Sequence, residues 1–190
     1  PRRPARLRAR CYDRDPPPYK ALDSPVAALA RQLRQRDEAE LKTVLPPETE
    51  ALVALFPVLH QAPAVAALVP APSAIPGKRD LRAALRPDTP AFRALRGLLV
   101  GLAARRPLVL WIDDLQWGDA DSVRALAELL RPPESPRALL IASFRSEDGG
   151  SPALRALGGL QDMAEQAGSS VHVLDLAPLG EHARARHDAR

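Results

Sequence analysis

The C-terminal half of the chain alternates short apolar segments with amphipathic ones, and this alternation restricts its fold more than any other feature. The stretch "LVLWI", Leu108 to Ile112, is five consecutive apolar residues, and a second apolar segment spans Ala138 to Phe144. A helical pattern from Ala120 to Leu130 lies between them. Continuous apolar strands separated by helices are typical of a parallel sheet covered on both faces. The sequence therefore predicts an α/β fold.

Helix signals fill the N-terminal half of the chain. Ser24 followed by Pro25 marks a helix start, because a capping hydroxyl precedes a proline at the first helical position. The remaining predicted elements are a strand over 6–12, helices over 37–45, from 48 to the break at Pro57, over 92–102 and over 153–166, and a strand over 171–174. The alanine- and proline-rich residues 61–90 predict a loop-like insertion. We expect one domain over 1–180 and a polar tail over 181–190.

Composition excludes several classes of protein. No apolar run among the 190 residues approaches the roughly 18 that a membrane helix needs, so we expect no membrane partner. Cys11 is the single cysteine, which rules out an internal disulfide and fits the cytoplasm, and the four histidines form no metal-ligand spacing with it. The 27 basic residues are spread along the chain beside only 4% aromatic residues, so we expect no direct nucleic-acid binding.

Two aspartates, Asp113 and Asp114, follow the first apolar run directly. Ionised carboxylates at the end of a buried strand are costly unless something pairs with them. An apolar strand that ends in aspartate has the form of a Walker B element, whose first carboxylate holds the Mg²⁺ that bridges nucleotide phosphates. A second acidic residue can polarise the attacking water. A strand that ends in a turn, with Asp114 capping the next segment, is equally compatible with these residues alone.

The wider context resembles a known family. The segments "LVLWIDDLQWGDADS" and "LLIASFRSE" resemble the ATPase module of the STAND class of P-loop NTPases. These are ORC/AAA-like signalling ATPases found beside bacterial serine/threonine kinase domains and in large helix-turn-helix regulators. The segment "RARCYDRDPPPYKALDSPVAALARQL" resembles the part that follows the P-loop helix in that class. The resemblance covers most of residues 6–180 and implies a three-layer P-loop NTPase-like sheet that uses ATP and Mg²⁺.

The resemblance also implies roles for three residues at strand ends. Asp113 matches the aspartate that coordinates Mg²⁺, and Asp114 matches the acid that activates water. Arg145 matches the sensor arginine that faces the γ-phosphate; without the family it would be an ordinary surface arginine. In open parallel sheets, ligands bind at the carboxyl ends of the strands, where all three residues fall.

Neighbouring residues are expected to have structural roles. Trp117 and Gln116 belong to the family pattern, and we expect Trp117 to pack beneath the site. Asp119 and Asp121 are expected to cap and charge-balance the next helix. We expect Cys11 to be a small buried residue rather than a nucleophile.

The phosphate-binding loop of this class, G-x-x-x-x-G-K-S/T, is missing from the sequence. Gly77-Lys78 is the only Gly-Lys pair, but Pro72 stands where the first glycine belongs and Arg79 where Ser or Thr belongs. In the family the loop precedes the strand that matches Arg6–Tyr12. A fragment of a larger protein is the simplest interpretation, and a degenerate NTPase that has lost its loop is the alternative. We expect the chain as given to be inactive.

The functional hypothesis is a partial ATP-binding module of a multidomain bacterial signalling protein, with a serine/threonine kinase domain upstream. Its partners would be ATP and the other domains of the parent chain. Two alternatives stay open: the ATPase module of a large transcriptional regulator, and a non-catalytic interaction domain that has lost nucleotide binding. The family implies parallel strands in the order 6–12, 108–113 and 138–144, then the place of the missing P-loop strand, then 171–174.

Overall fold

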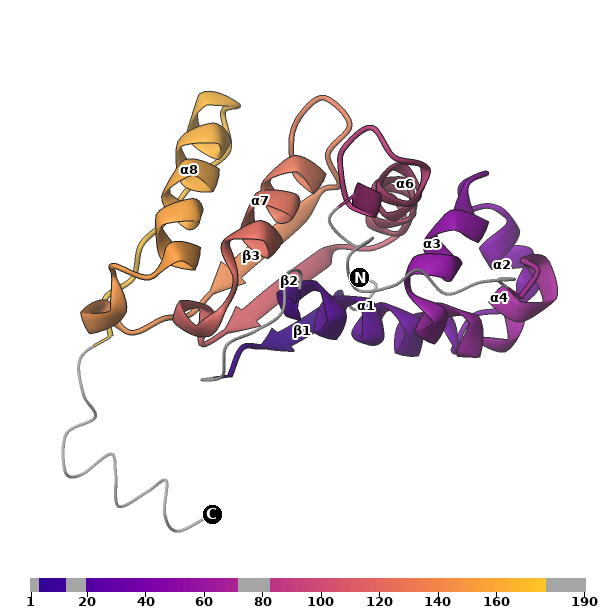
Figure 1. Ribbon diagram of the computed structural model, residues 1–190. Helices are drawn as coiled ribbons and strands as arrows, with labels where there is room; N and C mark the ends of the chain where they lie inside the picture. Colours follow the sequence, from indigo (N-terminus) through magenta and orange to yellow (C-terminus); the bar gives the residue numbers. More distant parts are fainter. Residues whose placement is uncertain (1–3, 13–19, 72–82, 177–190) are drawn as a thin grey trace, which may run out of the picture.

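In the described part of the chain, three parallel strands form one open sheet at the centre of the fold (Figure 1). The computed structural model describes residues 4–12, 20–71 and 83–176. The strands, in the order in which they pair, are β1 (Ala5–Arg10), β2 (Leu108–Asp113) and β3 (Ala138–Ala142). The α/β class and the predicted order of these three strands are confirmed.

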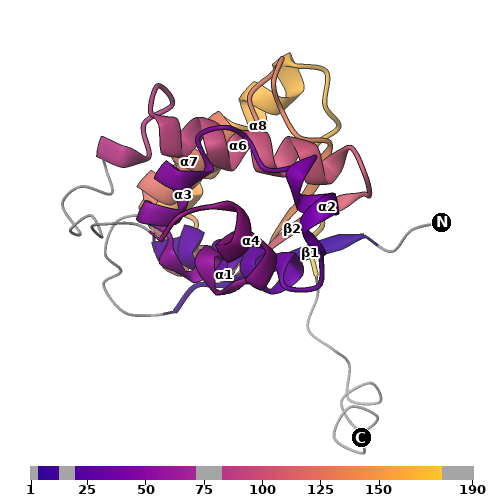
Figure 2. The same ribbon diagram turned by 90° about the vertical axis from the view of Figure 1, so that its right-hand side faces the viewer.

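Helices occupy most of the rest of the described chain. They are α1 (Lys20–Leu33), α2 (Glu38–Lys42), α3 (Thr49–Leu55), α4 (Pro63–Leu68), α6 (Pro90–Ala103), α7 (Ala120–Leu129) and α8 (Pro152–Gln166), with short 3-10 helices η1 (Pro57–Gln61), η2 (Leu115–Trp117) and η3 (Ser146–Asp148). Helices α2, α3 and α4 gather at the end of the molecule away from α8 (Figures 1 and 2).

The longer helices begin where the sequence supplies a capping side chain. The hydroxyl groups of Thr89 and Ser151 accept the amide hydrogens of Phe92 and Leu154, and a proline follows each cap at the first helical position. A side-chain oxygen at this position satisfies one of the amides that the helix itself cannot pair. The boundaries of α6, α7 and α8 therefore lie within two residues of the predicted ones.

Helices cover one face of the sheet in the described part of the chain. The buried residues Leu7 of β1 and Leu110 of β2 face a core built from α1, α6 and α7. Side chains on the opposite face alternate with them and are exposed: Trp111 at 38%, Leu139 at 58% and Ile141 at 42%. The apolar runs predicted coverage of both faces, whereas the described helices α1, α6 and α7 all pack on the same one.

Two helix predictions need correction. Helix α1 begins at Lys20 rather than at Ser24, and Pro25 lies inside it. Proline in a helix forgoes one backbone hydrogen bond, but here Pro25 packs into the core beside Leu22 and Val26. The predicted loop over 61–90 contains α4, because Pro63 starts a helix whose Ala64 and Val65 are buried; residues 72–82 of that stretch lie outside the described part.

The predicted strand over Val171–Leu174 is wrong. These residues have no regular secondary structure and are not part of the sheet. Val173 and Leu174 are 68% and 82% exposed. A strand needs a neighbour to pair with, and among the described strands β3 pairs only with β2. The predicted tail over 181–190 lies outside the described residues. None of the described helices is long and apolar enough to cross a membrane.

Within residues 4–12, 20–71 and 83–176, β3 has an open edge beside an exposed apolar face, and this should make the isolated chain self-associate. We expect the double substitution Leu139→Lys and Ile141→Lys to reduce association, because charged side chains on an exposed edge strand oppose pairing with another chain. Sedimentation velocity over a range of protein concentrations measures this. Val100→Lys changes a comparably exposed apolar residue of α6 and should leave association unchanged; an equal effect of both changes would contradict the prediction.

Candidate functional site

The carboxyl ends of all three strands meet around Asp113. The parallel register places Arg10 of β1 opposite Asp113 of β2. Backbone hydrogen bonds extend the pairing beyond the strands: the Cys11 amide donates to the Asp113 carbonyl at 2.9 Å, and the Ser143 amide donates to the Ile112 carbonyl at 3.0 Å. The side chains that follow β1, β2 and β3 are therefore held at one edge of the sheet, where ligands of open parallel sheets bind.

Asp114 turns the chain out of the sheet. Its backbone is left-handed, with φ 56° and ψ 45°, and it is the only described non-glycine residue with positive φ. Aspartate visits this region more readily than most residues, at a cost of about 1 kcal/mol. Ser143 secures the turn: its hydroxyl accepts the Asp114 amide at 3.3 Å, and its carbonyl accepts the Leu115 amide at 2.9 Å.

Both carboxylate oxygens of Asp113 have protein partners. The Ser143 hydroxyl donates to Oδ1 at 2.6 Å, and the Arg8 guanidinium donates to Oδ2 at 3.2 Å. The hydrogen bond from Ser143 is the main cause that holds the pKa of Asp113 below its ordinary value, and Arg8 and Arg10 add to it. Partial burial raises the same pKa but is outweighed. Asp113 is therefore ionised throughout the neutral range.

Asp114 pairs with the next arginine along β1. Nε of Arg10 donates to Oδ2 of Asp114 at 2.9 Å, and Nη2 lies at 2.9 Å from the same oxygen. The carboxylates at the end of β2 thus have arginine partners, together with the Ser143 hydroxyl. Sequence reasoning missed Arg8, Arg10 and Ser143 as site residues. The available signal was the alternation of arginines in "RLRARC", which a parallel register places on the same face as Asp113.

Arg145 lies near these groups in sequence but outside their network. It is exposed, it stands two residues beyond Ser143, and it precedes the 3-10 helix η3. Within the described part of the chain its side chain makes no ion pair.

The residues around Asp113 suit a magnesium ion in the chemistry of their donors. Carboxylate and hydroxyl oxygens are hard ligands, and Mg²⁺ commonly binds one or two carboxylates while retaining water and phosphate oxygens. The described residues contain no cluster of three or more His, Cys, Asp or Glu side chains that could hold a metal by themselves. An ion at Asp113 would therefore depend on other ligands, such as nucleotide phosphates. The rejected Gly77-Lys78 pair lies outside the described residues.

The structural roles expected for neighbouring residues are confirmed. Asp119 caps α7, accepting the Ser122 amide at 2.7 Å, and Asp121 lies in the first turn of that helix. Trp117 is partly buried against the core. Cys11 is 7% exposed, and burial together with Asp119, Asp114 and Asp113 raises the pKa of its thiol to about 11. A thiol with so high a pKa is a poor nucleophile at neutral pH.

Gln116 is a buried polar residue in the turn that follows the carboxylates. Its side chain is 4% exposed, and neither the amide nitrogen nor the amide oxygen has a hydrogen-bond partner among the described residues. A buried amide without partners costs about 1–3 kcal/mol. The turn therefore contains a polar group that the described part of the chain does not satisfy.

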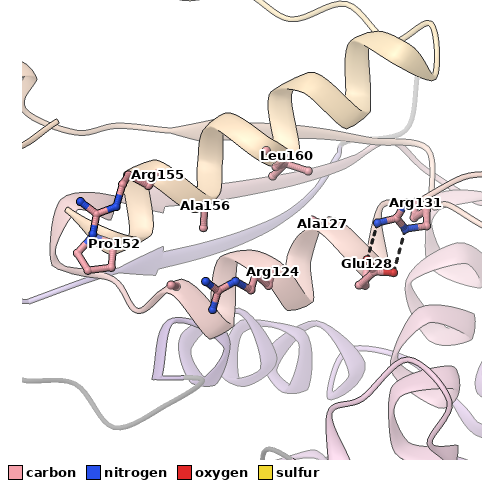
Figure 3. A pocket seen from close by; sticks show the side chains of 10 residues that line it. Arg124, Ala127, Glu128, Arg131, Pro152, Arg155, Ala156 and Leu160 are labelled. Atoms are coloured by element: carbon pink, nitrogen blue, oxygen red, sulfur yellow. Dashed lines mark hydrogen bonds and ion pairs between the residues drawn. The ribbon is translucent and has the colours of Figure 1, made fainter. Parts of the chain in front are cut away.

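A separate groove of about 450 Å³ lies between α7 and α8 (Figure 3). Ala127, Ala156 and Leu160 contribute apolar side chains to it, and arginines from both helices line it. Arg131, two residues beyond the end of α7, also lines the groove and forms a two-pronged ion pair with Glu128, with nitrogen–oxygen distances of 2.9 and 2.5 Å. None of Asp113, Asp114 and Arg145 lines this groove, so it is distinct from the carboxylate site.

Comparison with protein families identifies the class to which this sheet and its carboxylates belong. A family model described as AAA ATPase domain matches residues 2–141, which is more than half of the chain. The chain belongs to this family. The match includes β1, β2 and both aspartates but ends before Ser143 and Arg145. Comparisons with curated proteins and with solved structures gave no match.

Replacement of Ser143 by alanine should raise the pKa of Asp113, because it removes the main cause that lowers it. A lowered folded-state pKa contributes stability that is present above the ordinary carboxyl pKa, near 4, and is lost as the pH falls through the folded-state value. Ser143→Ala should therefore also lower the free energy of unfolding at pH 7, by about 1 kcal/mol. Carboxyl ¹³C NMR titration and urea denaturation measure the two effects.

Ser146→Ala, at an exposed serine in η3, is the matched control and should leave both quantities unchanged. An Asp113 pKa that does not move in the Ser143 variant would show that this hydrogen bond does not hold the carboxylate in its ionised form.

Proposed function

We propose that this chain is part of the ATP-binding module of a multidomain bacterial signalling protein, in which Asp113 coordinates Mg²⁺ and Asp114 polarises the attacking water. The observation that carries the proposal is the placement of both carboxylates at the carboxyl edge of a parallel sheet, within the region that matches the AAA ATPase domain family. By resemblance, the parent has a serine/threonine kinase domain upstream. The residues encoded upstream of Pro1 test this part of the proposal directly.

The partners of Asp113 differ from those of a helix-capping carboxylate, which leaves a metal role open to it. A capping carboxylate would accept the amides of a following helix, as Asp119 does for α7. Among the residues that the structure describes, none donates such an amide to Asp113; its hydrogen bonds come from the Ser143 hydroxyl and from a guanidinium. When bound there, Mg²⁺ would offset the charge of the phosphate oxygens. Ser143 would hold the carboxylate in a fixed orientation, in the way that second-sphere groups orient metal ligands.

Phosphate binding must come from a loop that this sequence does not contain. One edge of β3 has no partner among the described strands, and Trp111, Leu139 and Ile141 form an exposed face beside it. Both features support a site that is completed by another strand and helix. We propose that a P-loop strand pairs with β3, and that its loop holds the phosphates of the bound nucleotide in front of Asp113 and Arg145. The 190-residue chain by itself should then hydrolyse no measurable ATP.

In a longer protein that supplies the P-loop, Asp113→Asn should reduce Mg²⁺-dependent ATP hydrolysis by about 100-fold or more, because it removes charge stabilisation of the transferred phosphoryl group. Steady-state phosphate release measures this effect. Asp121→Asn changes a nearby carboxylate that belongs to the first turn of α7 and should retain activity. Full activity of the Asp113 variant would remove the Walker B assignment.

Arg145→Ala in the same longer protein should weaken the binding of ATP about tenfold relative to that of ADP. The reason is that a charged hydrogen bond to the γ-phosphate contributes about 1.5–3 kcal/mol. Its thermal stability should not change, because Arg145 is exposed. Competition binding of the two nucleotides and a melting curve give both values. Arg155→Ala, in the groove between α7 and α8, is the charge-matched control. A nucleotide preference equal to that of the wild type would make Arg145 an ordinary surface residue.

A further inference from the structure

The arginines of β1 form a row beside the carboxylates of β2. Arg6, Arg8 and Arg10 lie on the exposed face, opposite Val109, Trp111 and Asp113 respectively. Arg8 reaches Asp113, and Arg10 reaches Asp114. Their side chains are 57% and 55% exposed, so neither pair is sealed from water and either arginine can leave its partner.

Aromatic rings hold two of these guanidinium groups in place. The Arg8 guanidinium carbon lies 4.3 Å from the centre of the Trp111 ring, and that of Arg10 lies 5.9 Å from the centre of the Tyr12 ring. Cations over aromatic faces at these distances are attracted to the ring. The rings therefore favour, without enforcing, the arginine positions beside the carboxylates.

A divalent cation bound by Asp113 would compete with these charges. Oδ2 of Asp113 already accepts from Arg8, and Oδ1 accepts from Ser143. A second positive charge at hydrogen-bond distance from the same carboxylate repels an incoming cation, while the hydroxyl of Ser143 carries no charge and does not. A phosphate group would remove this conflict, because it offers the displaced guanidinium a new anionic partner.

We propose that Arg8 and Arg10 are positioning residues that act as built-in counter-ions of Asp113 and Asp114, so that a divalent cation binds there only by displacing them. The proposal rests on the metal role of Asp113 proposed above. In this arrangement the metal alone binds weakly, and metal binding is coupled to the binding of phosphate. The carboxylates then remain paired and oriented whether or not nucleotide is present.

The test is titration of the purified chain with Mn²⁺ alone, with free Mn²⁺ measured by electron paramagnetic resonance at 0.15 M salt. Coulomb's law with Debye screening gives about a threefold gain in affinity for each unit charge removed about 6 Å from a divalent ion. The double variant Arg8→Gln/Arg10→Gln should therefore bind Mn²⁺ about tenfold more tightly than the wild type, and Arg10→Gln alone about threefold.

Arg6→Gln is the matched control, because it removes the same charge from the same face of the same strand. Arg6 lies about 7 Å from Arg8 toward the amino end of β1, away from Asp113, so the gain in Mn²⁺ affinity should stay below about 1.5-fold. Far-UV circular dichroism confirms that each variant is folded. A gain in the double variant no larger than that of Arg6→Gln overturns the counter-ion proposal.

Asp113→Asn, added to the double variant, separates this proposal from the function on which it rests. Loss of the gained affinity places the ion at Asp113 and supports both the metal role of Asp113 and the counter-ion role of the arginines. Unchanged affinity shows that Mn²⁺ binds elsewhere, which overturns the metal role of Asp113 and the counter-ion role with it. If the gain in the double variant is no larger than that of Arg6→Gln, but Asp113→Asn still abolishes Mn²⁺ binding, only the counter-ion role is overturned.

Discussion

Two negative charges at the end of a buried strand must be compensated, and the compensation organises this end of the molecule. The parallel register brings Arg10 opposite Asp113, and Ser143 bonds to both sides of the turn at Asp114. These contacts hold three strand ends together through a mixture of backbone bonds, one hydroxyl and two guanidinium groups. A shift of β1 by one residue would turn Arg8 and Arg10 to the covered face and leave both carboxylates without their arginine partners.

Local patterns were sufficient to predict most of the fold. The apolar run of β2 and the capped helices α6, α7 and α8 each have a strong signal of their own, so their positions could be read directly. The errors fall where distant residues decide the outcome. Pro25 lies inside α1 because its ring packs into the core. Val171–Leu174 has a strand-like composition but no neighbour in the sheet, and pairing cannot be read from composition.

The candidate site was predictable in part, for the same reason. Asp113 and Asp114 are marked by their place after an apolar strand, whereas Arg8 and Ser143 acquire a role only through the register of three strands that are far apart in the sequence. The alternation of arginines in β1 does not by itself show that Arg8 lies beside Trp111 and Asp113. Membership of the AAA ATPase domain family indicates the class of chemistry, and the strand register decides which side chains lie together at the carboxyl edge of the sheet.

The central claim is that the carboxyl edge of this sheet is the metal end of a nucleotide site. Paramagnetic relaxation by Mn²⁺–ATP, recorded by NMR on a longer protein that contains the P-loop, tests this claim most directly. The account predicts that the signals of Asp113, Asp114 and Ser143 broaden strongly, because relaxation falls steeply with distance from the ion, while those of Arg131 in the α7–α8 groove stay sharp. Broadening centred on the groove, with sharp signals from the three strand-end residues, would contradict it.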